Sequence, residues 1–175
     1  LILLPLIGSF FIFFNKSSEK NRTIKYVSIF ITFSNFLLAL YLWYIFDKTI
    51  SDFQFIEDRE WISGLINYKV GIDGISILFV VLTAFITPLC VISVISTIKY
   101  RLKDFLIAIL IMESLMIGVF CSLDLVVFYL FFEGGLIPMF LIIGIWGGER
   151  RVYSAFKFFL YTLLGSVLML VAIIS

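Results

Sequence analysis

The sequence predicts an all-α integral membrane protein of about six transmembrane helices, with a short hairpin in the loop between the second and third. Its 175 residues are 62% hydrophobic and only 14% charged. A soluble domain carries roughly 45–50% apolar and about 25% charged residues. The mean hydropathy is +1.16, and a soluble domain of this length could not bury so much apolar surface in its core. In a bilayer, lipid covers that surface instead.

Six long apolar runs separate along the chain, and charged residues concentrate between them. Each run is expected to cross the bilayer as a helix, because lipid offers no partner to an unpaired backbone group. The runs are Leu1–Phe14, Tyr26–Phe46, Ile75–Ile98, Phe105–Phe120, Leu123–Trp146 and Tyr153–Ile174. No repeat or domain boundary interrupts them, so residues 1–175 are interpreted as a single transmembrane domain.

Two of these runs are short for a span, which needs about 20 residues. Basic residues follow the run Leu1–Phe14 instead of preceding it, unlike those of a signal peptide, so we interpret it as part of a first helix. The run Phe105–Phe120 is expected to extend into its flanks.

The loops predict the orientation of the chain. Basic residues concentrate in the loops Asn15–Lys25, Lys99–Asp104 and Gly147–Arg151, which alternate with the acidic loop Asp47–Gly74 and the tight turn Cys121–Ser122. The positive-inside rule places the basic loops in the cytoplasm or matrix and the N-terminus on the outer side. A hairpin on the outer membrane surface is expected within the acidic loop.

Several charged residues near the helix ends have structural interpretations. Asp73 precedes the third run and is expected to cap that helix, and Asp124 is interpreted in the same way for the fifth. Glu149, Arg150 and Arg151 form a loop cluster that is expected to set topology, with a solvated salt bridge as a second role.

Glu133, near the middle of the fifth run, is the first candidate for proton chemistry. An acid at the bilayer centre costs about 2.5–3.5 kcal/mol on insertion scales, so it needs a partner, a water-filled cavity or a proton. Pro138 removes a helical hydrogen bond and frees the carbonyl of Gly134. Gly134 and Gly135 leave room for water or a close neighbouring helix. The alternative is a structural role, in which the carboxyl is hydrogen-bonded to another helix.

Glu113, central in the fourth run, is the second candidate. The short turn makes the fourth and fifth helices antiparallel neighbours, so both carboxyls should lie at similar depth, which favours proton sharing or a cation between them. A polar anchor satisfied by Ser114 or the backbone is the alternative. Lys157 is interpreted as a counter-charge for an acid such as Glu133, or as a residue that snorkels to the inner surface.

The sequence contains no motif for metal binding, nucleotide binding or redox chemistry. There is no histidine, and the two cysteines, Cys90 and Cys121, give no metal-ligand or disulfide spacing. No phosphate-binding loop, nucleophile elbow or iron–sulfur cysteine cluster is present. The net charge of +1 gives no reason to expect nucleic-acid binding. We therefore expect no metal, no cofactor and no redox chemistry on this chain.

The residues named above resemble a known family. The stretches Glu113–Phe120 and Leu130–Phe140 are similar to the antiporter-like, proton-pumping subunits of respiratory complex I, the NADH–ubiquinone oxidoreductase. Three further stretches resemble the chain 4 branch of that family: Gly71–Ser76, Gly144–Tyr153 and Lys157–Thr162. The order of the six helices also agrees with the family, whose fold the chain is expected to share.

The resemblance implies roles for individual residues. Glu133 matches the essential glutamate of the fifth helix, which pairs with a lysine of the seventh helix to gate proton movement. Glu113 matches a glutamate on or near the same path, and Lys157 falls in a motif that tunes this cluster. The outer hairpin matches one that braces neighbouring subunits.

The resemblance also implies partners and a location. We expect a mitochondrial inner membrane, or alternatively a bacterial plasma membrane, and contacts with lipid and other membrane-arm subunits. The complex would use FMN, iron–sulfur clusters and ubiquinone elsewhere. Family members continue beyond the sixth helix, so a further segment or a second polypeptide would supply the remaining helices. A subunit of a multisubunit cation/proton antiporter and a structural scaffold of the membrane arm remain the alternatives.

Overall fold

The computed structural model describes residues 1–14, 22–47, 49, 52–62 and 66–174. Within them the chain forms six helices and one two-stranded antiparallel sheet. The helices are α1 (Leu3–Phe14), α2 (Arg22–Ile45), α3 (Ser76–Thr97), α4 (Leu102–Cys121), α5 (Leu125–Trp146) and α6 (Arg151–Ile174), and the strands are β1 (Gln54–Ile62) and β2 (Ile66–Ile72). The helical membrane fold predicted from the sequence is confirmed.

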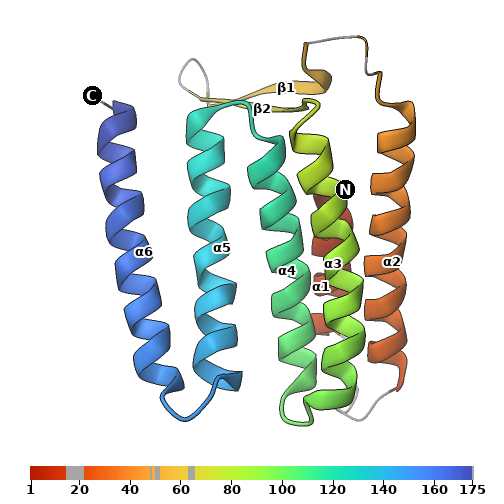
Figure 1. Cartoon of the computed structure of the whole chain (residues 1–175), viewed down its shortest axis with the longest axis vertical. Coiled ribbons are helices and arrows are strands. Elements are labelled where there is room, and N and C mark those ends of the chain that lie inside the picture. The colour runs from red at the N-terminus through yellow and green to blue at the C-terminus, as the bar shows by residue number, and fades with distance from the viewer. Residues whose placement is uncertain (15–21, 48, 50–51, 63–65, 175) are drawn as a thin grey trace.

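Five helices, α2 to α6, are long and apolar enough to cross a membrane, whereas α1 is shorter. They run side by side and alternate in direction (Figure 1). The helix α4 reaches Leu102 and Cys121, so its run extends into both flanks as predicted. All six helices begin or end within a few residues of the predicted runs.

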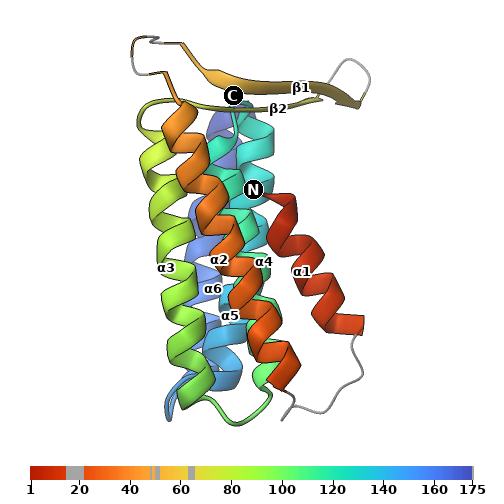
Figure 2. The same ribbon diagram turned by 90° about the vertical axis from the view of Figure 1, so that its right-hand side faces the viewer.

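The helix α4 occupies the centre of the bundle. It packs against α1, α3 and α5, while α2 packs on α3 and α1, and α6 packs on α5. Figure 2 shows α3 at one edge of the bundle and α1 at the other, with α2 and α4 between them. Among the five candidate spans α4 is the most buried and α6 the least. Large apolar side chains of α6, such as Leu160 and Leu168, are therefore exposed for lipid or for a further helix.

Two apolar clusters along α4 form the core. One gathers Leu106, Ile109 and Leu110 with residues of α1, α2 and α3. The other gathers Ile117 and Cys121 with residues of α2, α3 and the hairpin. Glu113 lies on α4 between these two clusters, so a buried carboxyl interrupts an otherwise apolar core.

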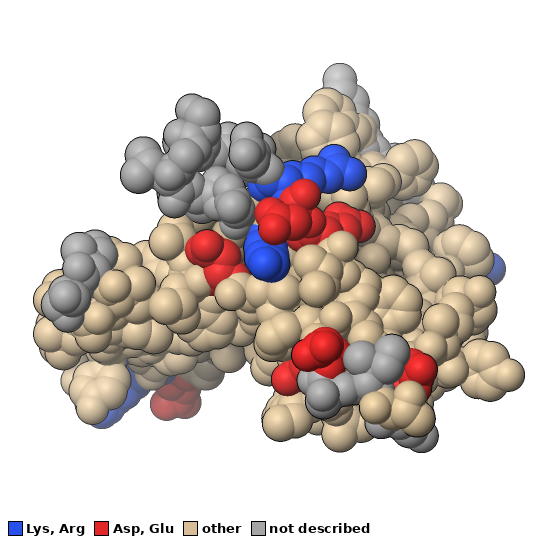
Figure 3. Space-filling model, turned by 90° about the horizontal axis from the view of Figure 1, so that it is seen from above, with Lys and Arg blue, Asp and Glu red and all other residues tan. Residues whose placement is uncertain are grey.

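The predicted hairpin is present and lies across one end of the bundle (Figure 2). It is joined to the α4–α5 turn, because the Leu123 N–H donates to the Lys69 carbonyl at 3.0 Å and Val70 pairs with Ser122. Charges of both signs gather on this end (Figure 3), where Lys69 and Asp58 form an exposed ion pair at 3.7 Å. The α3–α4 and α5–α6 connections lie at the opposite end of the bundle (Figure 1).

Candidate functional site

Glu113 is held by a contact that the sequence did not reveal. Its side chain is 2% exposed, and its Oε1 accepts a hydrogen bond of 2.7 Å from the Asn35 Nδ2 on α2. Asn35 is fully buried. The interaction joins a carboxyl and an amide in the interior of the helix bundle, where a polar group without a partner costs about 1–3 kcal/mol.

The remaining oxygens of this pair have no partner among the described residues. Glu113 Oε2 and Asn35 Oδ1 are both buried and accept no hydrogen bond. Ser114, which was the expected alternative partner of Glu113, instead donates to the Ile2 carbonyl, just before α1, at 2.5 Å. The pair is therefore only half satisfied.

Asn35 belongs to a stripe of small and polar residues that buries α2 in the bundle. Ser28, Thr32, Asn35 and Ala39 are all buried, at spacings of three or four residues. The serine and threonine hydroxyls donate to carbonyls of their own helix. This helical spacing of small and polar residues in an apolar run was the signal in the sequence that could have identified Asn35 as a buried partner.

Glu133 lies on the side of α5 that faces α6. The Phe140 ring, two turns further along α5, packs against Phe159 of α6 at 5.4 Å between ring centroids. Residues seven apart in a helix share a face. The Glu133 Oε2 is buried and has no hydrogen-bond partner among the described residues.

Ser166 of α6 lies level with Glu133. Gly144 faces Ala155 and Phe140 faces Phe159, and this antiparallel register continues to Glu133 and Ser166. Ser166 is 3% exposed and donates its hydroxyl to the Leu163 carbonyl at 2.9 Å. The sequence reading did not single out Ser166, although it is a small polar residue within the sixth apolar run.

The two carboxyls lie at similar depth on different faces of their helices. Gly118 packs on Phe131 and Gly134 on Leu115, so the register places Glu133 one turn from Glu113, about 4.5 Å along the axis. Glu113 faces α2, whereas Glu133 faces α6. The similar depth agrees with the prediction, but the structure does not bring the two acids together to share a proton or a cation.

The residues around Glu133 divide between two environments. A Cβ on Gly134 would lie 3.3 Å from Leu115 of α4, so this glycine permits close helix packing, while nothing lies within 4 Å of a Cβ on Gly135. Pro138 is buried inside α5, which remains helical through it. Because Pro138 has no N–H, it cannot bond the Gly134 carbonyl one turn earlier.

Lys157 does not reach Glu133. The α5–α6 register places Lys157 level with Ile142, nine residues from Glu133, or about 13 Å along the axis. Its ammonium lies 5.9 Å from the ring centroid of Tyr153, a cation–π contact, and its side chain is exposed. Among the described residues it forms no ion pair, so the arrangement favours the snorkelling interpretation.

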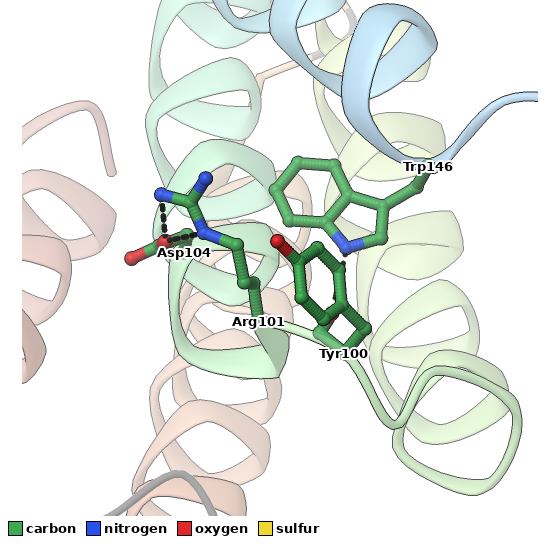
Figure 4. A network of polar contacts seen from close by, with 4 residues as sticks. All are labelled: Tyr100, Arg101, Asp104 and Trp146. Carbon is green, nitrogen blue, oxygen red and sulfur yellow. Dashed lines mark hydrogen bonds and ion pairs between the residues drawn. The ribbon is translucent and has the colours of Figure 1, made fainter.

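The basic end of the bundle carries a network of polar contacts (Figure 4). Trp146 at the end of α5 donates its indole N–H to the Tyr100 carbonyl at 2.8 Å, and Arg101 pairs with Asp104 at 2.6 Å. The bond to Asp104 raises the pKa of Arg101. The Trp146 bond joins the α3–α4 connection to the end of α5, whereas the Arg101–Asp104 pair lies at the start of α4.

The loop cluster of Glu149, Arg150 and Arg151 is exposed. Its predicted salt bridge is not among the ion pairs of the described residues. Instead the Arg151 guanidinium donates to the Ile145 carbonyl at 2.8 Å, where a cation satisfies one of the last carbonyls of α5.

Both acids at the helix starts accept backbone hydrogen bonds. Asp73 accepts from the Ser76 N–H at 2.6 Å at the beginning of α3. Hydrogen bonds from the Ser76 side chain and backbone lower the pKa of Asp73. Asp124 is the N-cap of α5 and accepts from the N–H groups of Val126 and Val127, so its predicted role is confirmed.

A cleft of about 460 Å³ between α3, α4 and α5 reaches Glu113. Its walls are mostly apolar, with Thr83, Thr87 and Glu113 as the oxygen-bearing side chains. It gives one side of Glu113 a route to the surface of the bundle. Within the described part of the chain, no three Cys, Asp or Glu residues gather as metal ligands.

Comparisons with known proteins agree with this architecture. The family model for the transmembrane domain of NADH:quinone oxidoreductase/Mrp antiporter proteins matches residues 122–175. Subunit M of the NADH-quinone oxidoreductase of Rhodobacter capsulatus is 59% identical over 155 residues, 89% of this chain and 30% of that protein. NADH-ubiquinone oxidoreductase chain 4 of Marchantia polymorpha is 47% identical over 99% of this chain and 35% of its own length.

Solved structures give the same fold. A chain of respiratory complex I from Thermus thermophilus superposes with a TM-score of 0.82 and 30% identity, over 99% of this chain and 34% of that one. A chain of an archaeal membrane-bound sulfane sulfur reductase shares the fold at a TM-score of 0.78 and 20% identity, covering 98% of this chain and 26% of its own. The chain spans about a third of the length of the relatives it matches. Residues 122–175 therefore carry the transmembrane domain of the NADH:quinone oxidoreductase/Mrp antiporter family, and nearly the whole chain is similar to part of subunit M and of chain 4 of NADH–quinone oxidoreductases.

Proposed function

We propose that the chain is part of a proton-translocating membrane subunit of an NADH–quinone oxidoreductase and that Glu133 and Glu113 carry protons in it. The observation that supports this most directly is a pair of carboxyls at similar depth in membrane-crossing helices, each with a buried oxygen that has no partner in the described residues. A buried carboxyl in a membrane helix requires a proton, a partner or water.

The proposed mechanism separates redox chemistry from ion movement. Quinone would be reduced elsewhere in the complex, where flavin and iron–sulfur clusters reside, and this chain would hold no cofactor. The reduction would change the protonation and pairing of Glu133, so that a proton is taken up on one side and released on the other. The Glu133 Oε2 has no hydrogen-bond partner among the described residues, and we propose it as the acceptor for a cationic partner from the rest of the protein.

The remaining helices are proposed as the source of that partner. This chain spans about a third of its relatives, and α6 leaves most of its surface exposed. A further part of the same protein, or a second polypeptide, would cover α5 and α6 and face Glu133. Other membrane-arm subunits and lipid would cover the rest of the apolar surface.

The proposed orientation follows from the two ends of the bundle. Arg101, Arg150 and Arg151 lie at the end opposite the hairpin, whereas Asp58 of β1 and Asp73, just after β2, lie at the hairpin end. The positive-inside rule then places the hairpin and the N-terminus outside. Labelling Gly148→Cys and Asp58→Cys with a thiol reagent that does not cross membranes tests this, and labelling of Gly148→Cys from the outer side would reverse the orientation.

Substitution of Glu133 tests the proposed function. Glu133→Gln keeps the size of the side chain and removes its ability to carry a proton. The assembled complex should still oxidise NADH with quinone but fail to pump protons through this subunit. Glu149→Gln, an exposed loop acid a few residues beyond α5, is the matched control and should pump normally.

Two other functions would give different results. A cation/proton antiporter subunit is favoured by the scope of the matching family model, which includes Mrp antiporters; copurification with flavin and iron–sulfur proteins would exclude it. In a scaffold, Glu133→Gln would leave pumping unchanged, while deletion of the chain would prevent assembly.

A further inference from the structure

We propose that Asn35 is a positioning residue that holds Glu113 in its neutral, protonated form through a two-bond ring. In this ring the Asn35 Nδ2–H donates to Glu113 Oε1, the 2.7 Å bond present in the structure. A proton on Glu113 Oε2 then donates to Asn35 Oδ1. One proton thereby satisfies both oxygens that are otherwise buried without a partner.

Hydrogen-bonding capacity is the first argument for the ring. If Glu113 were ionised, two acceptors, Glu113 Oε2 and Asn35 Oδ1, would be buried with no donor. Exchanging the side-chain oxygen and nitrogen of Asn35 does not remove the problem. The Asn35 oxygen would then face Glu113 Oε1, and a proton would again be needed between these two acceptors. A buried carboxylate left partly unpaired is strongly disfavoured.

The neighbouring hydroxyls cannot supply the missing donor, because each is already engaged. Ser114 donates to the Ile2 carbonyl, and Ser28 donates to Ile24. Thr32, one turn before Asn35, donates to carbonyls of its own helix at 3.0 and 3.1 Å. The proton on Glu113 itself is the donor that remains.

Among the described residues, no lysine or arginine forms an ion pair with Glu113. The helices α1 and α3 contain no charged residue, and the only ones in α2 are Arg22 and Lys25 in its first turn. Lys25 lies ten residues before Asn35, or about 15 Å along the axis. The only charged residue of α5 is Glu133, which faces α6. The surroundings therefore favour the neutral acid.

The ring also defines how the proton can leave. The cleft between α3, α4 and α5 touches Glu113 and Thr87. Because Oε2 is itself buried, a water molecule must first move in from this cleft, and it then accepts the proton while the Asn35 amide stays unchanged. The broken O–H bond leaves a carboxylate that the entering water must then solvate. This transfer step depends on the proposed function, whereas the protonated ring does not.

Infrared difference spectroscopy of the intact complex in membranes tests the ring. The C=O band of protonated Glu113 is identified by its loss in Glu113→Gln, which keeps an amide pair with Asn35. At neutral pH this band should be present and lowered in frequency by hydrogen bonding. A carboxylate band that disappears in Glu113→Gln, with no protonated band, would overturn the proposal without any substitution of Asn35.

The contribution of Asn35 needs a second comparison. Asn35→Leu removes both bonds at similar volume, so the Glu113 band should move to the higher frequency of a free acid or be lost. Thr32→Val, on the same face of α2, is the control and should leave the band in place. An unchanged band in Asn35→Leu would refute the role of Asn35. Proton pumping is measured separately. Normal pumping by Glu113→Gln would refute the place of Glu113 in the proton path, but it would not bear on the proposed ring.

Discussion

Gly118→Ala should weaken the contact between α4 and α5 that places Glu133 in the bundle. A Cβ at position 118 would lie 2.6–2.8 Å from three carbons of the Phe131 ring, whereas carbon atoms pack at about 3.5–4.0 Å. The ring or the helix must therefore move by roughly 1 Å. Overpacking of this kind costs about 1–3 kcal/mol, which lowers the ratio of folded to unfolded protein roughly 5- to 160-fold.

Thermal inactivation of the complex in membranes measures this effect, with native gels to follow assembly. Gly135→Ala is the matched control, because it is also a glycine inside a membrane helix and nothing lies within 4 Å of its added Cβ. The variant Gly118→Ala should inactivate at a lower temperature than Gly135→Ala. Replacing Phe131 by Leu should restore part of the loss, since the smaller side chain vacates the space. Equal stability of the two alanine variants would refute the packing argument.

Two further changes test the ends of the helices. Asp73→Ala should cost about 1 kcal/mol by removing the acceptor for the Ser76 N–H, seen as faster amide exchange at the start of α3. Because the pKa of Asp73 is lowered in the folded state, its contribution is present above its unfolded pKa and is lost as the pH falls through the folded pKa. Protection at the start of α3 that stays constant on acidification, after correction for the intrinsic pH dependence of exchange, would contradict this. Trp146→Phe removes the hydrogen bond to the Tyr100 carbonyl and should lower the free energy of unfolding by about 0.5–1.5 kcal/mol. Amide hydrogens of the α3–α4 connection should then exchange faster than in the wild type. Unchanged exchange would show that this bond does not stabilise the connection.

The helices could be predicted from the sequence because an apolar segment that crosses lipid can satisfy its backbone hydrogen bonds only as a helix. An apolar run in a bilayer must satisfy its own N–H and C=O groups, so hydropathy locates each helix to within a few residues. The start of α5 was predictable for the same reason of local chemistry, since Asp124 caps the N–H groups within its own first turn. The hairpin was expected within the acidic loop Asp47–Gly74, and β1 and β2 lie there.

Partners between helices could not be predicted in the same way. The bond between Asn35 and Glu113 joins residues 78 positions apart, and it depends on which helices pack and at what rotation. The same holds for Lys157, which was interpreted either as a counter-charge for an acid such as Glu133 or as a snorkelling residue. The α5–α6 register separates the two by about 13 Å along the axis, and this register depends on how the two helices pack.

Proton translocation through Glu133 is the central claim, and the number of protons pumped per electron tests it most directly. Proteoliposomes containing the wild type, Glu133→Gln or Glu149→Gln complex would be driven with NADH and quinone, with redox turnover and proton uptake measured on the same sample. We predict that Glu133→Gln retains redox turnover and pumps fewer protons per electron, while Glu149→Gln matches the wild type. An unchanged ratio in Glu133→Gln would contradict the account.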